Sequence, residues 1–89
     1  MPWRKVVIRY ADAKARNDAG NALIEKFGTL YRNTGVPGDV EVFHKSYHEK
    51  HVFYFSQNAS EMAPELLSEF HSRPSADKPD LSSFRKIPL

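Results

Sequence analysis

The sequence contains no cysteine, and this absence excludes several kinds of structure and chemistry. Disulfide bridges, thiolate nucleophiles and zinc sites with cysteine ligands are ruled out. No apolar run approaches the roughly 20 residues that a membrane span needs. Arg4, Lys5 and Arg9 interrupt the apolar stretch near the N-terminus, so no signal peptide is expected. We therefore expect a soluble protein without a membrane partner, and a cytoplasmic one, because a cysteine-free chain fits a reducing compartment.

A large charge of one sign is missing as well. The formal net charge is only +2, which is too small to predict a nucleic-acid binder. The charges are nevertheless unevenly spread. Residues 1–16 carry five basic side chains, whereas residues 61–69 carry three glutamates and no base. We expect an electrically lopsided molecule.

The sequence does hold enough apolar material for one small core. Its 89 residues are 40% hydrophobic and 12% aromatic, a composition typical of a globular chain rather than a disordered one. Residues 1–89 are therefore expected to form a single domain. Small chains commonly gain burial by assembling, so a homodimer is the expected form.

Hydrophobic periodicity predicts six elements in this domain. We expect strands over residues 3–10, 39–47 and 51–56 and a short last strand within 81–89, together with a helix whose body covers 21–33 and a helix over 58–72. A Pro-rich loop over 72–80 precedes the last strand. The order β-α-β-β-α-β is typical of the ferredoxin-like sandwich, an α+β fold with a four-stranded antiparallel sheet and two helices on one face. In that fold the last strand lies beside the first.

Polar residues and prolines mark where the helices begin. Asp12, Asn17 or Asp18 is expected to cap the first helix, because its side chain can accept a hydrogen bond from a free backbone N–H. Pro64 suits the first turn of the second helix, where its missing N–H costs nothing. Gly20 and Gly28 weaken the first helix, and close packing onto the sheet is the expected reason for both.

The strands over 39–47 and 51–56 are predicted to form a tight hairpin, because only three residues separate them. With Glu49 and Lys50 as the turn, His48 lies opposite His51, and His44 lies opposite Phe55. The turn lacks the Asn-Gly pair that tight hairpins favour. A slip of one residue would exchange the faces of one strand relative to the other.

The two faces of the predicted sheet differ in chemistry. The more apolar set is expected under the helices, namely Val6, Ile8, Val40, Val42, Phe53 and Phe55. The open face mixes aromatic rings with cations. Its candidate binding or interface residues are Trp3, Lys5, Arg9, Phe43, Lys45, Tyr47 and Tyr54.

Such a face has several uses. It can be buried against a second copy of the chain or against another partner, either a protein or a small molecule. Its rings can stack bases of single-stranded RNA while its cations hold phosphates. Alternatively, sheet twist and the C-terminal tail cover the rings. The sequence favours a binding or assembly module that associates with itself through its sheet, with RNA binding as an alternative.

Three histidines lie close together in the hairpin, but they do not predict a metal site. His48 and His51 are expected opposite each other, and His44 lies about 13 Å up the strand. Two imidazoles can hold adventitious nickel or copper, whereas a catalytic zinc needs three protein ligands. No nucleophile, paired carboxylates or Gly-rich phosphate loop is recognisable. No metal, cofactor or catalytic constellation is expected.

The N-terminal part of the chain resembles one enzyme family. Met1-Pro2 followed by a strand, a helix and "TGVPGDVEV" is similar to the opening of the tautomerase superfamily, over residues 2 to about 42. The resemblance implies an enzyme in which Pro2, after removal of Met1, acts as the general base. The family's substrate-binding arginine has no counterpart here, and Glu41 lies in that region. A tautomerase-like enzyme is therefore the alternative from a different functional class.

Overall fold

The structure is a computed structural model that describes residues 3–33, 40–62, 64–75 and 78–88. Its elements along the chain are β1 (Arg4–Arg9), α1 (Ala13–Asn33), β2 (Val42–Ser46), β3 (Lys50–Phe55), α2 (Gln57–Met62), α3 (Pro64–Glu69), β4 (Arg73–Pro74) and β5 (Arg85–Lys86). The class is α+β, as predicted. Over the described ranges, five strands and three helices replace the four strands and two helices that the sequence predicts. None of the described helices is long and apolar enough to cross a membrane.

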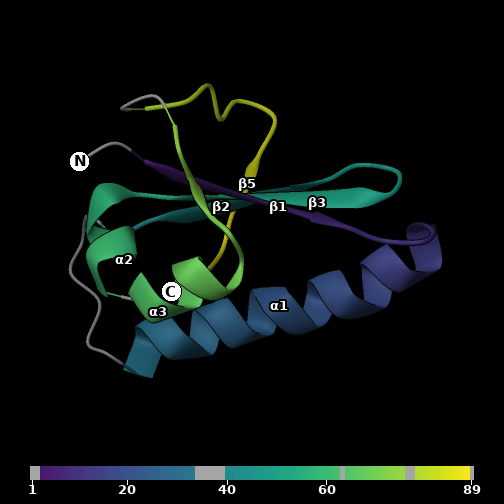
Figure 1. The fold of residues 1–89 in the computed structure, drawn as a ribbon, viewed down its shortest axis with the longest axis horizontal. Coiled ribbons are helices and arrows are strands. Elements are labelled where there is room, and N and C mark those ends of the chain that lie inside the picture. The colour runs from purple at the N-terminus through teal and green to yellow at the C-terminus, as the bar shows by residue number, and fades with distance from the viewer. Residues whose placement is uncertain (1–2, 34–39, 63, 76–77, 89) are drawn as a thin grey trace.

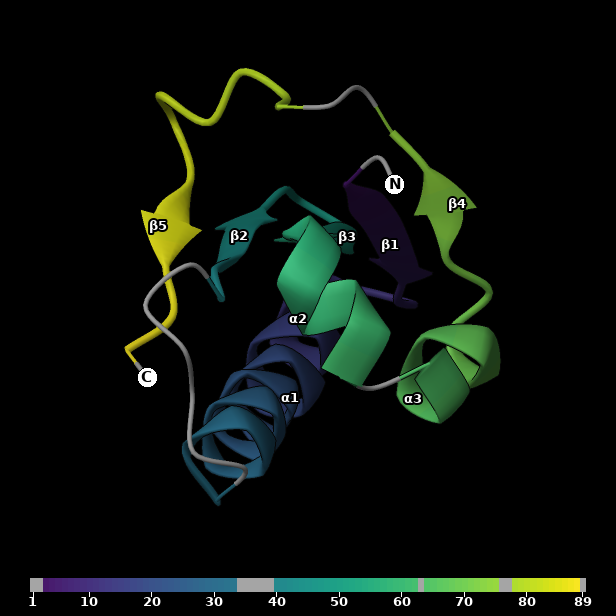
Figure 2. The ribbon, with the colours of Figure 1, turned by 90° about the vertical axis from the view of Figure 1, so that its left-hand side faces the viewer.

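The strands form one antiparallel sheet in the order β4-β1-β3-β2-β5. The three helices lie on one face of this sheet (Figure 1). Residues 78–84 pass over the other face on the way to β5, so that they arch above the sheet between its two edges (Figure 2). The face that the helices leave uncovered is therefore not fully open to solvent.

The predicted position of the last strand is wrong. It was expected beside the first strand, but β5 pairs with β2 at the opposite edge, with Phe43 opposite Lys86 and His44 opposite Arg85. The neighbour of β1 at its outer edge is β4, which falls inside the predicted loop over 72–80 and places Lys5 opposite Arg73. A ladder of two residues has no hydrophobic period, so the sequence pattern gives no sign of it.

Phe27 lies at the centre of the core between α1 and the sheet. Its ring is fully buried and meets the rings of Phe53 and Phe55 edge-on, at centroid distances of 5.0 and 5.3 Å. Burial of one such ring stabilises the fold by about 1.5–3 kcal/mol. Tyr31, one turn further along α1, is also fully buried. Its hydroxyl donates a hydrogen bond to the carbonyl of Ala59 at 2.8 Å, which joins α2 to α1.

The first helix begins earlier than its predicted body, at Ala13. Asp12 is the cap, since its Oδ1 accepts a hydrogen bond from the Ala15 N–H at 2.8 Å. The predicted second helix is divided into α2 and α3. Pro64 begins α3, as expected of a residue that suits a first turn.

The predicted hairpin is present, but its register is wrong by one residue in each strand. Tyr47 donates its N–H to the Lys50 carbonyl at 2.9 Å, which makes His48-Glu49 the turn. Ser46 then lies opposite His51. In the observed register each residue of β2 has a partner two positions away from the predicted one. Because side chains alternate between the faces with a period of two, every residue keeps its predicted face while its cross-strand partner changes. His48 and His51 are therefore not opposite each other.

Candidate functional site

The aromatic rings of the open face are largely covered by the chain itself. Trp3 is only 8% exposed, with its ring 6.1 Å from that of Phe43. Tyr54 meets Phe84 of the arching segment at 5.2 Å. Tyr47 is the exposed ring, at 37%. This is the arrangement that was expected if the C-terminal tail covers the face.

The predicted cations of this face divide between two places. Lys45 lies on the β2 side, where its Nζ donates a hydrogen bond to Ser83 Oγ at 3.0 Å and lies 5.1 Å from the centre of the Tyr47 ring. Lys5 and Arg9 lie on the β1 side and line a hollow of about 470 Å³. We call it the β1-edge hollow, and its lining residues are Lys5, Val7, Arg9, Lys50, Phe70, His71 and Arg73.

Two pairs of like charges lie opposite each other across the strands of this hollow. Lys5 is opposite Arg73, and Arg9 is opposite Lys50. Side chains directly opposite in an antiparallel pair have their Cβ atoms about 5 Å apart, and like charges at that spacing are destabilising. Both pairs lie on the face of β1 that also carries Val7. The fold therefore holds four cations together where cross-strand pairing normally favours opposite charges.

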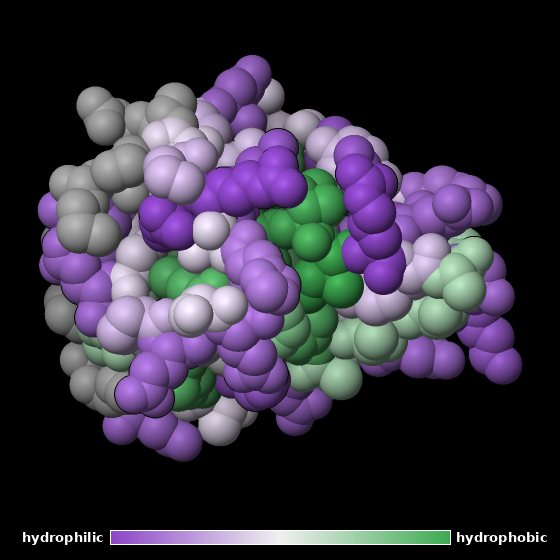
Figure 3. Space-filling view, viewed as in Figure 1, coloured by the Kyte–Doolittle hydropathy of each residue, from purple (hydrophilic) through white to green (hydrophobic). Residues whose placement is uncertain are grey.

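No described carboxylate lies within ion-pair distance of any of these four cations. The two ion pairs that the described residues form are Lys86–Glu41 at 3.7 Å and His48–Glu49 at 4.0 Å. The floor of the hollow is apolar, since Val7 is 37% exposed between the two charged pairs. Figure 3 shows an apolar strip that begins at the level of the sheet and continues toward α1, with hydrophilic side chains on both sides. Cations around an apolar floor form a site that attracts anions.

The rim of the hollow carries a residue with an unusual backbone. His71 has φ 53°, the one positive value among the described residues other than glycine. It ends α3, because its N–H donates to the Ser68 carbonyl at 3.1 Å and the next N–H, of Ser72, donates to the Leu67 carbonyl at 3.0 Å. Glycine is the usual residue at this position of a helix end. Backbone strain of this kind concentrates at functional sites.

Replacing His71 with glycine is expected to raise the free energy of unfolding by about 0.5–1 kcal/mol. The substitution removes the steric cost of the left-handed conformation, less the entropy that glycine adds to the unfolded chain. Thermal unfolding would show a midpoint several degrees higher. His48→Gly is the matched control, because His48 is exposed and has no positive φ, and it is expected to lower the midpoint. A His71→Gly midpoint below that of the wild type would contradict the assignment of strain.

The histidine pair on the helix-covered face is not the predicted one. His44 Nδ1 lies 3.1 Å from His51 Nε2, whereas His48 lies in the turn with its side chain 82% exposed. His44 and His51 are diagonal neighbours across β2 and β3, a contact that the corrected register brings about. No described group of three or more His, Asp or Glu side chains is placed to hold a metal ion.

His51 is enclosed by its neighbours. It is 2% exposed and stacks on Phe53 at 4.4 Å with an angle of 17° between the rings. Gly20 of α1 lies directly over it, and a Cβ at that position would lie 2.6 Å from His51 Nδ1. Burial, then the neighbouring His44 and Arg16, lower the pKa of His51 to about 4. The pKa of His44 is also lowered, mainly by burial and to a lesser extent by the positive charge of Arg85.

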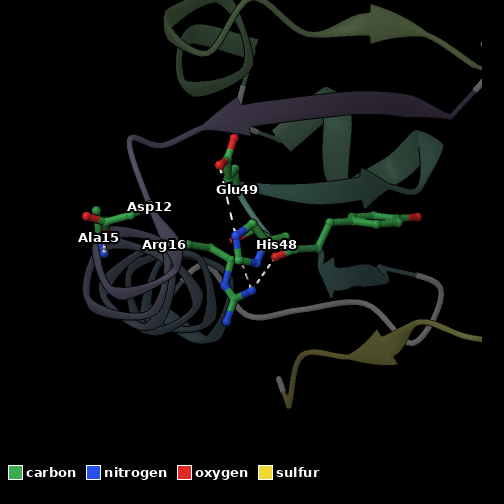
Figure 4. A network of polar contacts seen from close by, with 6 residues as sticks. Asp12, Ala15, Arg16, His48 and Glu49 are labelled. Atoms are coloured by element: carbon green, nitrogen blue, oxygen red, sulfur yellow. Dashed lines mark hydrogen bonds and ion pairs between the residues drawn. The ribbon is translucent and has the colours of Figure 1, made fainter.

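The first turns of α1 are tied to the hairpin through Arg16. Its guanidinium donates to the carbonyl of Tyr47 and to that of His48, the latter at 3.4 Å, and to Asn17 Oδ1 at 2.6 Å. Figure 4 shows Arg16 reaching from the helix to the turn, with Asp12 at the start of the helix. These bonds place a fixed positive charge near His51, the buried member of the histidine pair.

Comparisons with protein-family models, with curated proteins and with solved structures give no match to this chain. The function has to be argued from the residues of the sites themselves. Pro2, the predicted base of the tautomerase alternative, lies outside the described residues, and that alternative stays a prediction.

Sequence reasoning found Lys5 and Arg9 but missed the other residues of the hollow. The correct hairpin register would have placed Lys50 in β3 instead of the turn, but its position opposite Arg9 comes from the pairing of β3 with β1. Arg73 and His71 lie in the segment that leads from α3 into the two-residue strand β4. No periodicity marks their position, so only the fold brings them to β1.

Proposed function

We propose that this protein is a binding module whose β1-edge hollow holds a ligand with two or more negative charges. The observation that carries the proposal is the cross-strand register of β1, which places Lys5 opposite Arg73 and Arg9 opposite Lys50. Like charges at directly opposite positions lower the stability of the free protein, and an anion bound between them is attracted by both charges. The apolar floor at Val7 suits the organic part of such a ligand.

The other uses predicted for the open face have less support. Base stacking needs exposed rings, and Trp3 and Tyr54 pack against rings of the chain itself. A second copy seated on the face would meet the arching residues 78–84 before it met the sheet. Self-association through the sheet and the ferredoxin-like arrangement stay predictions, and the oligomeric state in solution tests the first of them.

A double substitution of the β1 cations tests the proposed function. We expect pyrophosphate, used as the probe, to bind the wild type in isothermal titration calorimetry and to bind more weakly as salt rises. Lys5→Gln with Arg9→Gln is expected to weaken that binding on the order of tenfold or more, because charge-assisted hydrogen bonds to the anion are lost. The same double variant should fold normally, since it also removes two like-charge pairs at opposite positions of the strands.

The matched control removes the same charge elsewhere. Lys14→Gln with Lys86→Gln changes the net charge equally, on the exposed side of α1 and on the opposite sheet edge. If both double variants weaken pyrophosphate binding to the same extent, the net charge of the protein causes the binding and the hollow is not the site. Absence of pyrophosphate binding to the wild type would also remove the proposal. A single-stranded oligonucleotide that binds far more tightly than pyrophosphate would favour the RNA alternative.

A further inference from the structure

A second recess lies at the opposite edge of the sheet, where β5 stops pairing with β2. The ladder between them ends at His44 opposite Arg85, so Lys45 and Ser46 continue β2 without a described neighbour strand on that side. The recess measures about 330 Å³. We call it the β2-edge notch, and its lining residues are Asn21, Ile24, His44, Lys45, Ser46, Ser83 and Arg85.

The notch is positively charged and rich in hydrogen-bond donors. Lys45 and Arg85 carry fixed positive charge, and none of the lining residues is acidic. Arg85 forms no ion pair with any described residue. Asn21 adds an amide, and Ser46 and Ser83 add hydroxyls. This set of donors matches the oxygens of a small oxyanion.

His44 connects the notch to the buried interior. One of its ring nitrogens, Nδ1, is engaged with His51 Nε2, which leaves Nε2 for a ligand. Positive charges act on this pair from several elements: Arg85 of β5 acts on His44, and Arg16 of α1 acts on His51. On the side of α1 that lines the notch, Asn21 and Ile24 are uncharged. No described acidic side chain is among the lining residues to offset these charges.

We propose that the β2-edge notch binds a small oxyanion, such as a sulfate or a carboxylate group, and that His44 takes up one proton when the anion binds. The proton comes from the solvent and adds to the free ring nitrogen, so the bound state holds imidazolium beside the anion. In the free protein, burial first and then the charge of Arg85 oppose protonation of His44, and the bound anion offsets the second of these effects. Binding is therefore stronger at lower pH. This site is separate from the β1-edge hollow and does not depend on it.

Nuclear magnetic resonance of the histidine rings tests both parts of the proposal. Sulfate is the probe, because it does not titrate in the relevant pH range, and sodium chloride matches the ionic strength. We expect sulfate to shift the backbone amide signals of Asn21 and Ser83 and to move the midpoint of the His44 ring titration upward by about one pH unit. The exposed His48 ring serves as the internal reference, and its midpoint should not move.

Two variants assign the effect to the notch. Arg85→Gln should abolish both the amide shifts and the change in the His44 midpoint, whereas Lys86→Gln on the same strand should preserve them. Amide shifts with an unchanged His44 midpoint would overturn the proton uptake. Unchanged amide signals in sulfate, or equal midpoint shifts of His44 and His48, would overturn the site itself. The double variant Lys5→Gln with Arg9→Gln should give the same sulfate-induced shifts as the wild type. The test of the β2-edge notch is therefore independent of whether the β1-edge hollow binds an anion.

Discussion

Gly20→Ala is expected to destabilise the protein by about 1–3 kcal/mol, although alanine is the better helix former. The added Cβ would lie 2.6 Å from Nδ1 and 3.2 Å from Cε1 of His51. The imidazole has little room to retreat, because it stacks on Phe53 at 4.4 Å on one side and meets His44 at 3.1 Å on another. Overpacking therefore outweighs the gain of about 1 kcal/mol in helix propensity. Urea unfolding at neutral pH measures the difference.

Gly28→Ala is the matched control in the same helix. Its Cβ would lie 2.9 Å from Nη1 of Arg32, the far end of a flexible and exposed side chain. That side chain can move away at the cost of its hydrogen bond to the Pro88 carbonyl. We expect this variant to be neutral or up to about 1 kcal/mol more stable. Equal destabilisation by both substitutions would show that the contact with His51 is not the cause.

A double-mutant cycle makes the same point independently. In a His51→Ala background the ring that opposes the new Cβ is gone, so Gly20→Ala is expected to lose most of its cost. A coupling energy near zero between the two positions would contradict the packing of Gly20 on His51. Gly20 thus allows α1 to pack closely on the sheet, as the sequence predicts for this position. The prediction is not met at Gly28, because the side chain nearest to it is Arg32 of the same helix.

The core could be predicted from the sequence because its pattern is periodic. Phe27 falls on the apolar stripe of α1, and Phe53 and Phe55 alternate on β3 toward the helices. A period constrains many residues at once, so one misplaced boundary does not change which side chains are buried. The α+β class and the faces of the hairpin strands follow from this kind of signal.

Features that depend on single contacts could not be predicted in the same way. The turn at His48-Glu49 has no Asn-Gly signal, so its position was wrong by one residue, and with it the histidine pair. The strands β4 and β5 contain two residues each. Their pairing with β1 and β2 is decided by where the long C-terminal segment runs. The sequence therefore showed two of the four cations in the β1-edge hollow, and the fold adds Lys50 and Arg73.

Acidification is expected to lower the free energy of unfolding by about 2–4 kcal/mol through His51 alone. Burial lowers the pKa of this residue from 6.5 to about 4. Between these two values the unfolded chain binds a proton that the folded chain does not. Stability is therefore complete above pH 6.5, falls as the pH decreases toward 4 and levels off below that value. His44, whose pKa is shifted in the same direction, adds to the decline.

His51→Gln provides the decisive comparison, because glutamine keeps a polar side chain at this position but does not titrate. The slope of unfolding free energy against pH between about 6.5 and 4 should flatten in this variant, whatever its absolute stability. His48→Gln should retain the wild-type slope, since the His48 side chain is 82% exposed and its ion pair with Glu49, at 4.0 Å, joins two exposed side chains. Urea unfolding at several pH values in that window measures all three slopes. If His51→Gln keeps the wild-type slope, the pH dependence comes from other groups and the buried imidazole is not its source.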